Sequence, residues 1–163
     1  MAYQSNMWVV QIARVHDKRP GYDCQTNEDQ IRNIFEPMFQ ATLNPHLAEY
    51  AAVSELLKRV GAVNIISDEM IRKRNFHSEV RPPHTIPWAE EPDDFYFYYY
   101  VWCNLATLNA LRKKRGLNLF HFRPTCGEST PHWDQLVSSY LLADSINQGV
   151  KLEGSWVLQY LYL

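Results

Sequence analysis

The stretch Leu117–Glu128, LNLFHFRPTCGE, decides the fold class of this chain. Its apolar part, Leu117–Phe122, predicts a β-strand, and the residues that follow predict a turn that carries an acid before the next helix. An α/β barrel has its chemistry at such strand ends. Glu128 is the expected acid, whereas Thr125 stands where a metal-assisted hydrolysis would need a histidine.

The rest of the chain alternates short apolar stretches with amphipathic ones. Further strands are expected over residues 7–13, 62–66 and 148–152, and helices over 28–39, 46–60, 93–115, 131–147 and 154–163. Pro37 is expected to kink the first helix, and Gly61 to end the second. The proline-rich residues 70–92 are expected to form a long loop, which within a compact domain is usually functional.

This order gives about four βα units, so residues 1–163 are expected to form a single truncated domain. A closed (β/α)₈ barrel has eight units and about 250 residues. The predicted fold is therefore α/β: about half of a TIM-type (β/α)₈ barrel, with parallel strands and flanking helices. Half a barrel leaves two sheet edges unpaired, so we expect other protein chains, in a multi-subunit assembly, to cover them.

Bulk properties exclude several classes of partner and site. The net charge of −2 gives no field that attracts nucleic acid, and no apolar run reaches the ~18 residues of a membrane span. The three cysteines form no CxxC pair, which argues against a disulfide framework or a zinc knuckle. We expect an intracellular, reducing compartment, either cytoplasmic or mitochondrial.

Three further patterns have both a functional and a structural interpretation. The six histidines include no HxH or HExxH pair, and His121 on its strand is expected to be structural. Cys126 could be a nucleophile if His132 lay beside it, but a buried cysteine is the favoured interpretation. The basic run Arg112–Arg115 could bind phosphate, but its position before Gly116 favours a helix C-terminus.

Several stretches, in the same order, resemble the AMP deaminase family within the adenosine/AMP deaminase superfamily. They are Asn33–Pro45, Val60–Glu69, Leu108–Gly116, Phe122–Glu128 and Val157–Leu161. The resemblance spans nearly the whole chain and corresponds to the central portion of the family. It implies a zinc-bearing (β/α)₈ barrel that hydrolyses AMP to IMP and ammonia, in which zinc lowers the pKa of the attacking water.

The resemblance implies a site that has changed. Glu128 matches the family glutamate that protonates the purine ring. Thr125 replaces a zinc-ligand histidine, and Gln148 replaces the histidine that orients the water. Since a threonine hydroxyl is a poor zinc ligand and a glutamine is no general base, we expect loss of the zinc site, no metal or other cofactor, and no active catalytic residue. Glu128 would then pair with a cation such as Arg123.

Three functions follow as hypotheses. The first is a non-catalytic AMP-deaminase-like protein that is not an enzyme and acts as a structural or assembly subunit of a larger complex. The second is one part of a split zinc-dependent AMP deaminase that converts AMP to IMP and ammonia. The third is a regulator that still binds a nucleotide. The resemblance disfavours it, because the family's HxH strand, with two zinc ligands, and the phosphate-binding residues near that strand have no match in this sequence.

Overall fold

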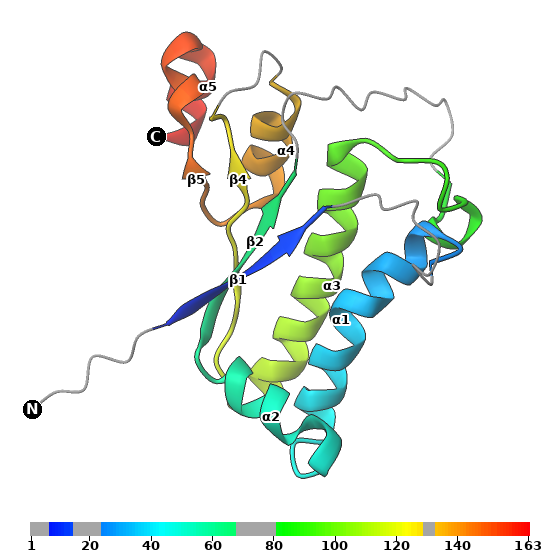
Figure 1. Cartoon of the computed structure of the whole chain (residues 1–163). Coiled ribbons are helices and arrows are strands. Elements are labelled where there is room, and N and C mark those ends of the chain that lie inside the picture. The colour runs from blue at the N-terminus through cyan, green and yellow to red at the C-terminus, as the bar shows by residue number, and fades with distance from the viewer. Residues whose placement is uncertain (1–6, 15–23, 68–80, 129–132) are drawn as a thin grey trace, which may run out of the picture.

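The computed structural model describes residues 7–14, 24–67, 81–128 and 133–163, which form an α/β fold (Figure 1). The strands are β1 (Trp8–Ala13), β2 (Val60–Ile66), β3 (His121–Phe122), β4 (Thr125–Cys126) and β5 (Asn147–Gln148). The helices are α1 (Asn27–Leu43), α2 (Ala48–Leu57), α3 (Asp94–Lys114), α4 (Asp134–Leu142) and α5 (Trp156–Tyr162), with short 3₁₀ helices η1 (Pro83–Thr85) and η2 (Val150–Gly154).

All strand pairs are parallel, and neighbouring strands follow the order of the chain. One sheet has the order β1-β2-β3, and β4 pairs with β5. Arg123 and Pro124 connect the two sheets, because Arg123 N–H donates to the Val63 carbonyl (2.8 Å) and Asn147 N–H donates to the Pro124 carbonyl (2.9 Å). Sequential parallel strands with helices between them are what a portion of an α/β barrel requires, so the predicted fold class is confirmed.

The predicted strand over Leu117–Phe122 is too long. Only His121 and Phe122 pair with β2. The backbone of Phe120 is instead satisfied by a side chain of α3: its N–H donates to Asn109 Oδ1 (2.9 Å), and its carbonyl accepts from Asn109 Nδ2 (2.8 Å). Pro124, which has no N–H, then separates β3 from β4.

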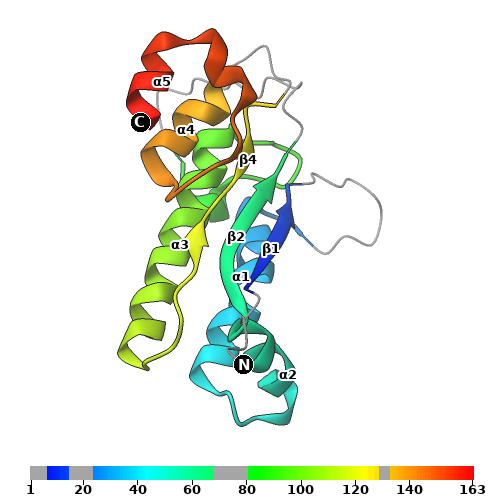
Figure 2. The same ribbon diagram turned by 90° about the vertical axis from the view of Figure 1, so that its left-hand side faces the viewer.

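The main core lies between the β1–β2–β3 sheet and helices α1 and α3. It includes buried apolar side chains from every one of these elements, among them Ile12, Val60, Val63, Ile65, Phe122, Ile31, Phe35, Met38, Tyr98, Val101, Leu105 and Leu108. A smaller cluster of Cys126, Leu136 and Leu158 lies where α4 and α5 pack beside β4 and β5 (Figure 2).

Helix α1 begins with a capping box between Thr26 and Asp29. α1 continues to Leu43, beyond the expected end at residue 39, with Pro37 on its exposed side. The expected kink at Pro37 stays a prediction. Gly61 was expected to end the second helix. It lies instead inside β2, where the register against β1 shifts between Trp8 and Val9. Glycine is common at such irregularities in strands.

The helical spacing of the sequence predicts a buried face for α3 made of Phe95, Tyr98, Tyr99, Trp102, Leu105, Leu108 and Leu111, and this prediction is only partly correct. Tyr98, Leu105 and Leu108 are buried and Leu111 is half-buried, whereas Phe95, Tyr99 and Trp102 are exposed. The face predicted for the helix at α4 is Leu136, Val137, Tyr140, Leu141 and Ile146. Leu136 is buried and Ile146 half-buried, but Val137, Tyr140 and Leu141 are exposed. Both helices have apolar residues on two faces, so periodicity alone cannot select the buried one.

The basic run lies at the C-terminus of α3 before Gly116, as expected, and two of its cations have a further role. Arg112 is only 2% exposed. Its guanidinium donates to Asn118 Oδ1 (2.7 Å), Thr42 Oγ1 (3.2 Å) and backbone carbonyls. Arg115 donates to the carbonyls of Thr42 and Leu43. Two of the four cations thus hold the C-terminus of α1. In the described part of the chain, no helix is both long and apolar enough to cross a membrane.

Candidate functional site

The candidate site lies at the carboxyl ends of β4 and β5. Thr125 is in register with Asn147, and Cys126 with Gln148. Glu128 lies two residues after Cys126, just beyond the end of β4, and its side chain is exposed. The structure therefore brings the three predicted positions 125, 128 and 148 onto two adjacent strand ends, as expected for a barrel site.

Positive φ angles shape both strand ends. Gly127 has φ 74°, and a Cβ at this position would lie 2.9 Å from Leu136 Cδ2. Gln148 has φ 75° and is the one non-glycine residue with positive φ in the described part of the chain. Backbone strain of this kind in a non-glycine residue is concentrated at functional sites. Hydrogen bonds from Gly149 N–H to the Cys126 carbonyl (3.0 Å) and from Lys151 N–H to the Gly127 carbonyl (2.8 Å) fix the two turns together.

Thr125 is held by a residue that the sequence analysis did not select. Asn64 on β2 is 2% exposed, and its Nδ2 donates to Thr125 Oγ1 (2.9 Å). The Thr125 hydroxyl in turn donates to Asn64 Oδ1 (3.1 Å). An amide inside the apolar strand Val60–Ile66 was the available signal, because buried polar groups need partners.

The structure separates the two interpretations of Cys126. Its side chain is fully buried in the small cluster beneath α4, and its Sγ donates to Ser139 Oγ (3.3 Å). A nucleophile must be reached by its substrate, so the geometry favours the structural interpretation. His132, the expected base, lies outside the described residues.

The side chain of His121 is 71% exposed, so its expected structural role stays a prediction. Its Nδ1 lies 3.7 Å from Asp144 Oδ2, and the same oxygen accepts from the N–H of Phe122 (2.7 Å). Asp144 thereby holds the edge of β3, with His121 beside it. The expected pairing of Glu128 with Arg123 stays a prediction.

The described residues do not fit a zinc ion. Zinc takes imidazole nitrogen, thiolate sulfur or carboxylate oxygen. Residues 125 and 148 supply a hydroxyl and an amide, and the Thr125 hydroxyl is already bonded to Asn64. Across the described ranges, no three His, Cys, Asp or Glu residues lie close enough together to hold a metal. A zinc site in the whole enzyme would need ligands from outside these ranges.

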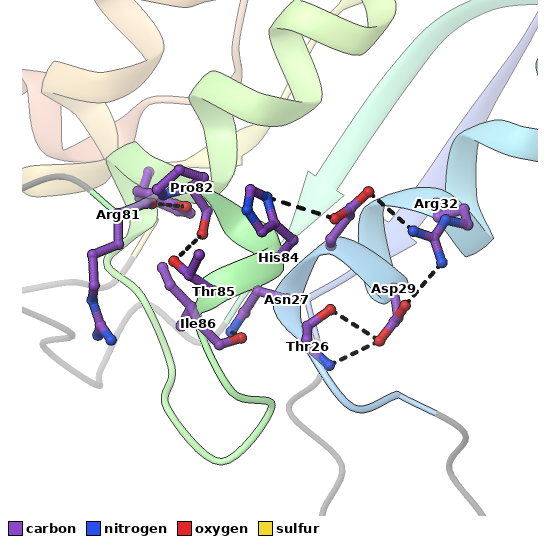
Figure 3. A network of polar contacts seen from close by, with 11 residues as sticks. Thr26, Asn27, Asp29, Arg32, Arg81, Pro82, His84, Thr85 and Ile86 are labelled. Atoms are coloured by element: carbon purple, nitrogen blue, oxygen red, sulfur yellow. Dashed lines mark hydrogen bonds and ion pairs between the residues drawn. The ribbon is translucent and has the colours of Figure 1, made fainter.

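A separate cleft of about 540 Å³ lies in the helical layer, between α1, α3 and η1. The network at its mouth joins η1 to the start of α1 (Figure 3). Asn27 Nδ2 donates to the carbonyls of Pro87 (3.2 Å) and Glu90 (3.0 Å), and Arg32 pairs with Glu28 (3.0 Å) and Asp29 (3.1 Å). The cleft shares no lining residue with the strand-end site.

Comparison with known proteins identifies relatives of the whole chain. The family model described as AMP deaminase matches residues 1–163. AMP deaminase 3 of Rattus norvegicus is 39% identical over 166 residues, which cover 98% of this chain and 21% of that protein. AMP deaminase of Saccharomyces cerevisiae is 37% identical over 157 residues, which cover 95% of this chain and 19% of that protein. The chain thus spans about a fifth of the length of these curated relatives.

These matches correct one expectation from the sequence. The prediction that the chain is not an enzyme is wrong, because relatives such as AMP deaminase 3 of Rattus norvegicus and AMP deaminase of Dictyostelium discoideum (31% identical) are enzymes by name, and the family is enzymatic and zinc-dependent. The replacements at positions 125 and 148 are therefore variations inside an enzyme family. On the match over its entire length, the chain belongs to the AMP deaminase family.

Proposed function

We propose that this chain forms part of an AMP deaminase and contributes Glu128 as the proton donor of the reaction. The observation that carries the proposal is the position of Glu128, which is exposed immediately beyond β4 at the carboxyl ends of parallel strands. In the reaction AMP and water give IMP and ammonia: a C6–O bond forms and the C6–N bond breaks. Addition of water to C6 places electrons on the adjacent ring nitrogen, which a carboxylic acid can protonate.

The neighbours of Glu128 support this role by fixing its backbone. Gly127 allows the sharp turn that directs the chain away from β4, and its carbonyl is held by the Lys151 N–H. Asn64 holds Thr125 from the opposite side. A donor held by rigid strand ends needs little reorganisation during the reaction.

We further propose that other parts of the enzyme complete the barrel along β1. The N–H groups of Trp8 and Arg14 donate to the carbonyls of Arg59 and Ile66, respectively. The backbone N–H and C=O groups of the even-numbered residues of β1 therefore face β2. The N–H and C=O groups of Val9, Gln11 and Ala13 therefore point to the open edge. A further parallel strand would satisfy these groups.

The other end of the fold has an apolar surface suited to the same purpose. We call it the α4–α5 surface: Val137, Tyr140, Leu141, Trp156, Val157, Tyr160 and Leu161, all exposed. Trp156 is 87% exposed and Tyr160 is 80% exposed. Exposed apolar groups of this extent mark contact surfaces in soluble proteins. The partner we propose is the next strand-and-helix unit of the enzyme, whether from the same chain or another.

The test of the catalytic role is AMP deamination by the purified full protein, with any chains that co-purify. Release of ammonia and IMP is expected, and Glu128→Gln should lower kcat about 100-fold or more. Glu153→Gln, which removes an exposed carboxylate on η2, is the matched control and should leave kcat unchanged. A protein that does not deaminate AMP, or a Glu128→Gln variant with unchanged kcat, would contradict the proposal.

Hydrogen exchange tests the completion of the barrel. In the assembled enzyme, the amide of Gln11 should exchange as slowly as those of Val10 and Ile12, because a paired edge protects every residue of the strand. Fast exchange at Gln11 beside slow exchange at Val10 and Ile12 would show an open edge.

The expected location of the protein, an intracellular and reducing compartment, stays a prediction.

A further inference from the structure

A buried polar cluster lies at the carboxyl ends of β1 and β2 and includes no residue of the site at the ends of β4 and β5. We call it the strand-end cluster: Arg14, Ser67, Asp94 and Gln135. Arg14 and Ser67 directly follow β1 and β2, whereas Asp94 and Gln135 lie in the first turns of α3 and α4. Arg14, Asp94 and Gln135 are buried.

Hydrogen bonds connect all four members of the cluster. Arg14 Nη1 donates to Asp94 Oδ1 within an ion pair, and Arg14 Nη2 donates to the Pro92 carbonyl. Gln135 Nε2 donates to Ser67 Oγ (2.7 Å) and to Asp94 Oδ2 (3.1 Å). Through Gln135, the first turn of α4 is therefore fixed to the ends of β1 and β2 and to the start of α3.

The residue after Gln135 is in close contact with the turn that precedes Glu128. This residue, Leu136, is fully buried in the smaller core cluster. A Cβ on Gly127 would lie 2.9 Å from Leu136 Cδ2, so no methyl group fits between the two residues. A shift of α4 would move Leu136 relative to Gly127, and the turn would have to follow or open a gap.

The bonds of Gln135 are the stronger restraint on the position of α4. One polar contact joins α4 directly to β4, from Cys126 Sγ to Ser139 Oγ (3.3 Å), and a thiol is a weak donor. The packing of Leu136 is apolar and therefore has little directional preference. Gln135 instead donates to a carboxylate, and hydrogen bonds to a charged acceptor are short and directional.

We propose, building on the role of Glu128 as proton donor, that Gln135 is a positioning residue for that acid. The strand-end cluster holds Gln135, and Leu136 beside it holds Gly127. Gly127 in turn sets the direction in which Glu128 leaves β4. A displacement of a reacting group by about 1 Å can lower a rate about 100-fold, so this support is expected to affect catalysis.

The variant Gln135→Met tests the proposal in the purified full protein, with any chains that co-purify. Methionine keeps the length of the side chain but cannot donate to Ser67 and Asp94. For AMP deamination, kcat should fall about 10-fold or more and KM should change by less than about twofold, because the substitution weakens an interaction of the transition state and not the binding of AMP. An unchanged kcat would overturn the proposal.

The background Glu128→Gln separates positioning from a general structural effect. If Gln135 acts through Glu128, adding Gln135→Met to Glu128→Gln should lower kcat by less than about twofold. A further loss as large as that in the unmodified protein would overturn the positioning role. A protein that does not deaminate AMP contradicts the proposed function itself, whereas an active protein whose kcat is insensitive to Gln135→Met contradicts only the positioning role.

Hydrogen exchange gives a readout that does not depend on activity. The Lys151 amide donates to the Gly127 carbonyl (2.8 Å) and reports on the turn before Glu128. In Gln135→Met its exchange should become faster by a larger factor than that of the core amide of Val63. Equal factors at the two amides would show that Gln135 does not hold this turn in particular, and would overturn the proposal.

Ser138→Ala is the matched control on α4. Ser138 is as buried as Gln135, but its Oγ donates to the Asp134 carbonyl of the same helix (2.6 Å). The variant should change neither kcat nor the exchange of the Lys151 amide. Effects as large as those of Gln135→Met would mean that any lost hydrogen bond on α4 disturbs the site, which contradicts a specific role for Gln135.

Discussion

Asn64 and Thr125 form a reciprocal hydrogen bond between β2 and β4, with 2.9 Å from Asn64 Nδ2 to Thr125 Oγ1 and 3.1 Å from Thr125 Oγ1 to Asn64 Oδ1. The pair spans the junction between the two sheets, where Pro124 interrupts the backbone ladder. A side-chain contact thus compensates for lost main-chain pairing, close to the end of β4 where Glu128 emerges.

This relationship makes the two residues energetically dependent on each other. Thr125→Val removes the hydroxyl and leaves the buried amide of Asn64 unsatisfied, so the free energy of unfolding should fall by about 1–3 kcal/mol. In Thr125→Val/Asn64→Leu, both polar partners are absent, and the loss should be smaller than the sum of the two single losses. Urea unfolding of the four proteins measures this. Strictly additive losses would mean that the pair contributes no interaction energy.

The turn after β4 requires glycine for two reasons, the positive φ of residue 127 and the approach of Leu136. Gly127→Ala should therefore lower the free energy of unfolding by about 2 kcal/mol or more. Gly116→Ala is the matched control, because Gly116 also has positive φ but no atom lies within 4 Å of the position that an alanine methyl group would take. It should cost about 1 kcal/mol. Equal losses would show that Leu136 yields to the added methyl group.

Arg112 is a buried cation whose partners are neutral oxygens of three separate segments. Arg112→Met keeps much of the side-chain volume and leaves Asn118, Thr42 and the Leu57 carbonyl short of donors. It also removes the cation–π contact with Phe120 at 4.3 Å. Urea unfolding should show a loss of at least about 2 kcal/mol.

Its neighbour on the same helix provides the control. Lys113 is exposed, and Lys113→Met should change the free energy of unfolding by less than about 0.5 kcal/mol. Similar losses for the two variants would mean that Arg112 contributes through its charge at the helix end, as the sequence suggests, and not through its buried hydrogen bonds.

The sequence predicted most of the order of strands and helices, because most are either a β-branched apolar run or a long amphipathic segment. It missed β4, which lies where a turn was expected, and η2, which takes most of the strand expected over residues 148–152. It could not predict where β3 begins, since the backbone of Phe120 bonds to the side chain of Asn109, eleven residues earlier. Local patterns do not contain such tertiary pairings. For the same reason, the sequence could not predict which face of α3 is buried, because aromatic residues lie on more than one side of this helix.

The candidate site was predictable only in part. Thr125, Glu128 and Gln148 could be placed near one another because parallel strands end at the same edge of a sheet. The roles of Asn64 and Arg112 could not be foreseen, because a polar residue in a strand or a basic run at a helix end has many possible partners. The expectation of an inactive protein is wrong for a different reason: it rested on replaced and missing zinc ligands, whereas the chain matches an enzyme family over its whole length.

Asp29 gives the N-terminus of α1 a predictable dependence on pH. Its carboxylate accepts hydrogen bonds from the N–H of Thr26 (2.8 Å), the Thr26 hydroxyl and the N–H of Gln25, and the Thr26 backbone bond is the main cause that lowers its pKa below 3.8. Because the folded-state pKa is lower than the unfolded one, the stabilisation is complete above the unfolded pKa. It is lost as pH falls below about 3.8 through the folded-state pKa.

Unfolding free energies measured from pH 6 down to pH 2 check this dependence. Asp29→Asn cannot titrate, so its stability should fall less steeply below about pH 4 than that of the unmodified protein. Parallel curves for the two proteins would show that Asp29 does not contribute to the acid sensitivity of the fold.

Asn27 fixes residues 81–92 against the start of α1 (Figure 3). Its Nδ2 donates to the Pro87 and Glu90 carbonyls and its N–H to the Ile86 carbonyl (3.1 Å). Asn27→Ala keeps the backbone bond but leaves the other two carbonyls without this donor, so the free energy of unfolding should fall by about 1–2 kcal/mol.

The same variant should loosen the segment locally, and hydrogen exchange at the Trp88 amide measures this. That amide donates to the Gln25 carbonyl (2.8 Å) and reports whether the segment stays in place. Its exchange should become faster in Asn27→Ala than the exchange of core amides such as that of Val63, because a local opening precedes global unfolding. Glu36→Ala, at an exposed position on the same helix, is the control and should not change it. If amide exchange at Trp88 and at Val63 becomes faster by the same factor in Asn27→Ala, Asn27 stabilises the whole fold and not this segment in particular.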